Sequence, residues 1–109
     1  MAGESFSVTR REMTELAVEH WRLTGALREG GSAAARHAAR KIGDFLQARG
    51  FVAQSLDGLP YDPGMNAKVV ERIKGYAPEG GDVVVETVAP LVMLAGDVIQ
   101  GAEVVVAGP

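Results

Sequence analysis

The sequence has no cysteine among its 109 residues, which excludes both a disulfide framework and a thiolate metal site. It also has no hydrophobic run near the ~18 residues that a membrane-spanning helix needs, and its first residues lack the apolar core of a signal peptide. We therefore expect a cytoplasmic protein without a membrane partner. A chain of this length forms one domain or two small ones, and its 14 glycines disfavour one continuous regular element.

Basic residues are scarce in the second half of the chain. Residues 51–109 contain three Lys or Arg against eight Asp or Glu, whereas residues 1–50 contain eight against six. Binding to a phosphate backbone requires clustered Lys and Arg. We therefore expect no nucleic-acid partner.

The first half of the chain predicts two helices. The stretch Thr9–Glu12 fits a capping box, in which a hydroxyl and a carboxylate satisfy the free N–H groups at a helix start. Gly30-Gly31 ends this helix, Ser32 can cap a second one, and Gly50 is the expected C-terminal stop. Together the two segments predict a helical hairpin.

The two predicted helices have apolar faces that the hairpin alone can only half cover. Apolar residues recur at alternating three- and four-residue steps on one face of the first helix, and the second helix has an apolar face of its own. On that second helix, Arg40 and Asp44 have the i,i+4 spacing of an ion pair. A second copy is the simplest cover, so we predict a homodimer held by a four-helix bundle. The expected dimer interface consists of Met13, Leu16, His20, Leu23, Leu27, Ile42 and Phe45.

After Gly50 the sequence changes to short segments rich in β-branched residues and separated by Gly, Pro and Asp. The stretch LVMLAGDVIQGAEVVV, residues 91–106, has two apolar runs around an Ala-Gly-Asp turn and a second break at Gln100-Gly101. It predicts a strand, a tight turn, a short strand and a final strand. Further strands are expected at 51–55, 67–73 and 83–88. The predicted fold is therefore α+β, with a helical hairpin at residues 1–50 and a small all-β domain, the wing, at residues 51–109.

Taken in order, these segments resemble the C-terminal part of GrpE, the nucleotide exchange factor of DnaK-type chaperones. Members of that family run from a helix ending in glycine, through an Asp-Pro turn, to an ending of alternating apolar residues. The segments LQARGF, LPYDPGMN and GGDVVVETVAPLVMLAGDVIQGAEVVVA follow that order with similar spacing over roughly residues 10–107. The most specific matches are the structural turn at Asp62 and Pro63 and the ending with Val98, Ile99, Ala102, Val104 and Val106.

The resemblance implies a homodimeric co-chaperone that acts in protein folding and the stress response. In the family, the helices form a four-helix bundle, and one β-wing binds the ATPase domain of the chaperone and opens its nucleotide cleft, so that ADP leaves. The long N-terminal paired helices of the family have no counterpart in this sequence, so we expect no stalk.

The wing departs from the family where the chaperone contact is expected. Asp97 and Gln100 occupy positions of basic residues, and Leu91-Val92 occupy those of a Gly-Tyr pair. Reversing a charge across a desolvated contact changes its energy by ~2–5 kcal/mol. A chaperone with a complementary basic surface would fit these residues, and so would a dimeric adaptor without exchange activity. Alternatively, the valines face the core of the wing and Asp97 only shapes the turn. The residues expected to bind a partner are Val92, Gly96, Asp97, Val98, Ile99 and Gln100.

Signatures of catalysis and of metal binding are missing from the sequence. His20 and His37 lie on different predicted helices without a trio of ligands at metal-binding spacing. Trp21, beside the apolar face of the first predicted helix, is typical of a packing residue. The turn aspartates, whose usual role is to accept backbone N–H bonds, are Asp57, Asp62 and Asp82. We therefore expect no enzyme activity, no metal and no cofactor.

Biotinyl and lipoyl carrier domains offer another interpretation of the wing, because they also place a Gly-Asp turn between short strands. A carrier needs a lysine at an exposed hairpin tip. The lysines of this chain are Lys41, Lys68 and Lys74, and none lies in a predicted tight turn.

Overall fold

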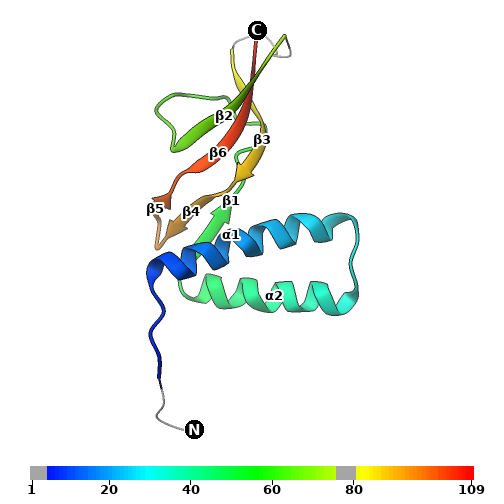
Figure 1. Cartoon of the computed structure of the whole chain (residues 1–109), viewed down its shortest axis with the longest axis vertical. Helices are drawn as coiled ribbons and strands as arrows, with labels where there is room; N and C mark the ends of the chain where they lie inside the picture. The colour runs from blue at the N-terminus through cyan, green and yellow to red at the C-terminus, as the bar shows by residue number, and fades with distance from the viewer. Residues whose placement is uncertain (1–4, 76–80) are drawn as a thin grey trace.

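The structure, a computed structural model, describes residues 5–75 and 81–109. Within these residues, two helices and a single 3-10 turn precede six strands, so the predicted α+β class is confirmed (Figure 1). Residues 76–80, between the strands expected at 67–73 and 83–88, lie outside the described residues. The elements are α1 (Arg10–Ala26), η1 (Leu27–Glu29), α2 (Ala33–Ala48), β1 (Phe51–Gln54), β2 (Ala67–Lys74), β3 (Val83–Ala89), β4 (Leu91–Leu94), β5 (Asp97–Gln100) and β6 (Ala102–Gly108).

Side-chain caps determine where both helices begin. The Thr9 hydroxyl accepts the Glu12 N–H at 3.0 Å while the Glu12 carboxylate accepts the Thr9 N–H at 2.9 Å, which confirms the predicted capping box. The Ser32 hydroxyl accepts the Ala35 N–H at 3.1 Å and caps α2. Beyond the end of α2, Gly50 has a φ of +86°, a conformation that favours glycine and ends the helix.

The strands form two three-stranded sheets. The first has the order β1-β4-β5 and is antiparallel throughout. The second has the order β2-β6-β3, in which β6 is parallel to β2 and antiparallel to β3. The strand, turn, short strand and final strand predicted for residues 91–106 are confirmed as β4, β5 and β6. Because β6 follows β5 after Gly101 alone, this stretch connects the two sheets.

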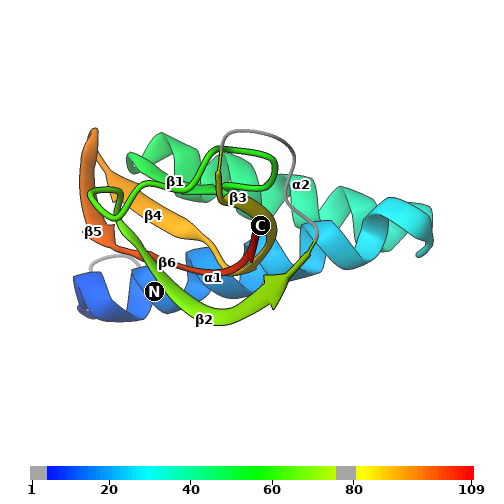
Figure 2. The same ribbon diagram turned by 90° about the horizontal axis from the view of Figure 1, so that it is seen from above.

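Each sheet has its own core. The first core joins both helices to the first sheet through Ala17, Val18, Leu46, Phe51 and Val92. It therefore takes residues from both sides of the predicted boundary at residue 50. Figure 2 shows the strands over one end of the helical pair, with the loop between the helices extending beyond them. The second core lies within the wing and consists of Leu56, Val84, Ala102, Val104 and Val106.

Candidate functional site

A tight turn at Ala95 and Gly96 joins β4 to β5. Their φ values are +51° and +89°, and positive φ at both central residues is the requirement of a type I′ hairpin turn. The Ala95 N–H donates to the Gly50 carbonyl at 2.9 Å, which ties the turn to the end of α2. The β4–β5 hairpin is thus anchored to the helical hairpin.

The structure separates the six residues that were predicted to bind a partner. Val92 is 0% exposed and lies in the first core, so its assignment to a contact surface is wrong. The reason is that β4 is the middle strand of its sheet and the helices cover this face. Ile99 is half-buried and packs against the same core. The remaining four, which we call the hairpin corner, are exposed: Gly96, Asp97, Val98 and Gln100.

Part of the predicted dimer interface is open to solvent. Leu16, Leu23 and Phe45 are 39%, 38% and 42% exposed, although large apolar side chains are usually buried. We call these three residues the apolar stripe. The Arg49 guanidinium lies 3.7 Å from the centre of the Phe45 ring and partly covers it.

The other residues predicted for the dimer interface make contacts within the chain. Met13 and Ile42 pack against the first core, and Leu27, in η1, is half-buried. His20 Nε2 lies 2.7 Å from the Ala39 carbonyl and links α1 to α2. Since a carbonyl only accepts, this nitrogen donates its proton. The first sheet covers one side of α1. The buried residues of α1, Thr14, Ala17 and Val18, therefore lie beside the predicted interface residues and not among them.

The turn predicted at Asp62-Pro63 is present. The Asp62 carboxylate accepts the Gly64 N–H at 2.8 Å, a local bond typical of aspartate in turns. The other two turn aspartates bond to strands instead. Asp57 accepts the Thr87 hydroxyl at 2.5 Å, and Asp82 forms an ion pair with an arginine of β2 at 2.6 Å. All three carboxylates therefore have structural roles.

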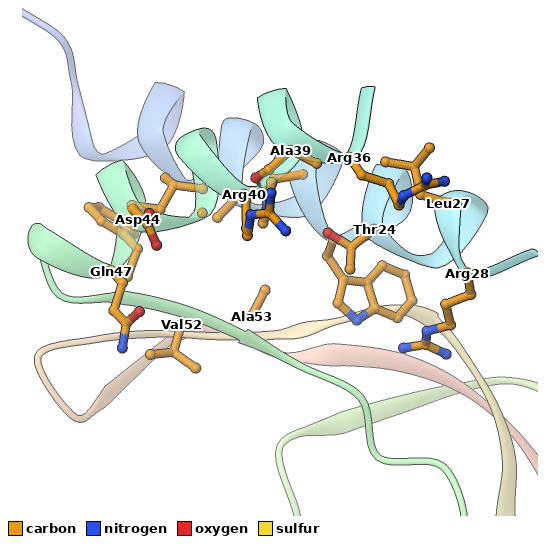
Figure 3. Close-up of a pocket in the computed structure, with 16 residues that line it drawn as sticks. Thr24, Leu27, Arg28, Arg36, Ala39, Arg40, Asp44, Gln47, Val52 and Ala53 are labelled. Atoms are coloured by element: carbon orange, nitrogen blue, oxygen red, sulfur yellow. Dashed lines mark hydrogen bonds between the residues drawn. The ribbon is translucent and has the colours of Figure 1, made fainter. Parts of the chain in front are cut away.

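A groove of about 590 Å³, which the sequence did not predict, lies between the helical hairpin and β1. In Figure 3, Arg28, Arg36 and Arg40 stand on its helical side, and β1 contributes Val52 and Ala53. These residues come from three separate elements, so only the packing of β1 beside the helices brings them together.

The groove also contains residues that sequence reasoning had placed differently. Trp21 lines it, and its Nε1–H donates to Ser55 Oγ at 3.2 Å. Arg40 and Asp44 line it as well, but they do not form the expected ion pair, which is missing from the ion pairs of the described residues. The one available sequence signal was the i,i+4 spacing of Arg36 and Arg40, which places both guanidinium groups on one side of α2.

The described residues were compared with the features of a metal centre, a membrane-spanning helix and a carrier lysine. No group of three or more His, Asp or Glu there is placed to hold a metal ion. No helix there is long and apolar enough to cross a membrane. The lysines lie on α2 and β2, and the β4–β5 turn that a carrier domain would modify contains none.

A scan against models of protein families and a search of curated proteins found no match to this chain.

Proposed function

We propose that the chain is a homodimeric co-chaperone similar to GrpE, which acts in the cytoplasm. In this proposal the hairpin corner binds the ATPase domain of a DnaK-type chaperone and promotes the release of ADP. The observation that carries the proposal is the arrangement of two exposed surfaces on one chain: an apolar stripe on the helices and a hairpin corner anchored beside them.

The apolar stripe supports the dimer. Burying a large apolar side chain stabilises a protein by ~1.5–3 kcal/mol relative to leaving it in water. Leu16, Leu23 and Phe45 forfeit part of this energy in the single chain. A second copy of the same stripe would recover it in an isologous contact, in which each helical hairpin covers the other.

The hairpin corner supports the chaperone contact. Val98, which is 40% exposed, offers an apolar surface beside the exposed carboxylate of Asp97. The type I′ turn and its bond to Gly50 pre-organise these side chains, which reduces the entropy lost on binding. Because Asp97 is negatively charged, the chaperone must present Lys or Arg opposite it.

The release of a fluorescent ADP from a DnaK-type ATPase domain tests the proposed activity. We expect the wild-type chain to accelerate release from the chaperone of its own host, and Asp97→Arg to weaken this effect by reversing a contact charge worth ~2–5 kcal/mol. Glu71→Arg, which makes the same charge change at an exposed residue of β2, is the matched control and should keep the activity. Unchanged release with and without the chain on every DnaK-type chaperone of the host rules out the exchange function.

The dimer is tested by sedimentation and light scattering. Leu23→Asp should dissociate or unfold the chain, because a carboxylate in a packed bundle is costly. Leu59→Asp is the matched control, because Leu59 is an exposed leucine outside the helices. A wild-type chain that remains monomeric at micromolar concentration with intact helicity contradicts the proposal.

The exposed carboxylate of Asp97 also favours a second function. A basic residue is expected at this position from the resemblance to GrpE, so the chain would serve as a dimeric adaptor that binds its partner without opening a nucleotide cleft. Capture of the chaperone ATPase domain by the wild-type chain, lost in Asp97→Arg and unaccompanied by faster ADP release, would assign the adaptor function instead of exchange.

A further inference from the structure

The groove between the helical hairpin and β1 is separate from both surfaces of the proposed function. None of the apolar stripe residues, Leu16, Leu23 and Phe45, lines it, whereas His20 and Leu27 of the predicted dimer interface do. The hairpin corner belongs to β5 and its turn, at the opposite edge of the first sheet from β1. The groove volume of about 590 Å³ lies within the range of about 300–1,000 Å³ that is typical of ligand sites.

The lining of the groove has an excess of positive charge. Arg28, Arg36 and Arg40 line it together with one carboxylate, that of Asp44. Arg36 donates one N–H to the Gly31 carbonyl at 2.7 Å, and neither Arg28 nor Arg40 belongs to an ion pair within the described residues. A guanidinium group binds a carboxylate through two parallel hydrogen bonds. The groove therefore favours a ligand with carboxylate groups.

Strand β1 contributes a free edge to the same groove. Among the described strands, β1 pairs with β4 alone. The bond from the Ala95 N–H to the Gly50 carbonyl places hydrogen-bonded pairs at Gly50 and Val52. Since such pairs alternate, the N–H and C=O groups of Phe51 and Ala53 point away from β4. Both residues line the groove, and an extended peptide can add to an edge of this kind.

We propose that the groove binds an extended acidic peptide segment of a partner protein, which adds to β1 as a further strand and places carboxylates on Arg28 and Arg40. Side chains of a strand alternate between its faces, so those on one face follow each other at about 6.6 Å. The ligand therefore has Asp or Glu at alternate positions, turned toward the helices. Neither the chaperone contact nor the dimer is needed for this binding.

Fluorescence anisotropy with a labelled peptide, Glu-Val-Glu-Thr-Glu-Val, tests the proposal, with Lys-Val-Lys-Thr-Lys-Val as the charge-reversed control. Trp21 lines the groove and is the single tryptophan of the chain, so its emission reports occupancy independently. We expect the acidic peptide to bind, to change the Trp21 emission and to dissociate as salt is added. Arg28→Ala and Arg40→Ala should each weaken binding about tenfold, which corresponds to about 1.4 kcal/mol.

Two further controls separate charge from strand addition. Arg11→Ala removes an exposed arginine of α1 that does not line the groove, and it should leave the affinity unchanged. An acidic peptide whose backbone is N-methylated at alternate residues keeps its charges but loses N–H donors. It should bind weakly when the methylated positions face β1.

Several results would overturn the proposal. One is an absence of binding at millimolar peptide, and another is equal binding of the lysine peptide. A third is an unchanged peptide affinity of the Arg28→Ala, Arg40→Ala double variant, provided that its circular dichroism spectrum matches the wild type. Equal binding of glutarate, or of the peptide N-methylated at either set of alternate positions, would indicate a site for small carboxylates and refute strand addition. Self-association of the chain that disappears in the double variant would assign the groove to a second copy instead of a partner protein.

Discussion

Replacing Gly43 by alanine tests how closely the two helices are packed. Gly43 lies inside α2, where alanine is favoured over glycine by about 1 kcal/mol. However, a Cβ at this position would lie 3.0 Å from Cε1 and 3.2 Å from Nε2 of His20. The ring cannot move away without lengthening its 2.7 Å bond to the Ala39 carbonyl. Overpacking of this kind costs about 1–3 kcal/mol. We therefore expect Gly43→Ala to lower the free energy of unfolding by about 0–2 kcal/mol.

Gly25 provides the matched control, because it is a glycine of α1 with no atom within 4 Å of the position of its added Cβ. Gly25→Ala should raise the free energy of unfolding by about 0.5–1 kcal/mol. In a His20→Ala background the obstacle is gone, so Gly43→Ala should then stabilise the chain by a similar amount. Urea unfolding followed by circular dichroism, at one fixed chain concentration, measures every member of this double-mutant cycle.

The outcome that refutes this reasoning is a Gly43→Ala variant as stabilised as Gly25→Ala in the otherwise wild-type chain. The coupling energy between the Gly43→Ala and His20→Ala substitutions would then be below about 0.5 kcal/mol, the level at which two sites are independent. Such a result would mean that the His20 ring is not held between the helices in solution.

Two other predictions concern hydrogen bonds of single side chains. Thr87→Val should lower the free energy of unfolding by about 1–3 kcal/mol, because the buried Leu56 N–H loses the hydroxyl that accepts it at 2.9 Å; Thr87→Ser keeps the hydroxyl and should cost less in the same urea titration. Hydrogen bonds from the backbone and then the side chain of Thr9 lower the pKa of Glu12 from its ordinary value of 4.5. This stabilisation of α1 is complete above the ordinary value and is lost as the pH falls through the lowered one. Helicity measured against pH should show this loss in the wild type but not in Glu12→Gln. Identical titrations of the two chains would contradict the prediction.

Local signals account for the features that the sequence predicted correctly. The capping box at Thr9 and the Ser32 cap determine the helix starts through bonds that span three residues, so they are visible in a short stretch. The turn at Ala95-Gly96 was likewise indicated by one glycine between two apolar runs, although Ala95 adopts a positive φ that alanine rarely takes.

Long-range pairing accounts for the features that the sequence could not predict. Val92 looked like a surface valine beside a turn, but β4 pairs with β1 on one side and β5 on the other, which places it under the helices. The pairing of β1 with β4 joins segments about 40 residues apart, and no local pattern indicates it. The groove follows from the same packing, since it exists only because β1 lies beside Arg28 and Arg40.

The two proposed surfaces of α2 lie on different sides of the helix and can be occupied together. Phe45 and Arg40 are five residues apart, which at 3.6 residues per turn places them about 140° apart around the helix axis. A second copy packed on Phe45 therefore leaves the Arg40 side open, and a dimer has two grooves related by its two-fold axis. Two acidic peptides joined by a linker long enough to span both grooves should then bind more tightly than a single peptide, because the second contact is intramolecular. Leu23→Asp should abolish this gain while the affinity for the single peptide stays the same, provided that the dissociated chain remains folded. Equal affinity of the linked and single peptides for a chain shown to be dimeric would mean that dimerisation covers the grooves, so that the two surfaces exclude each other.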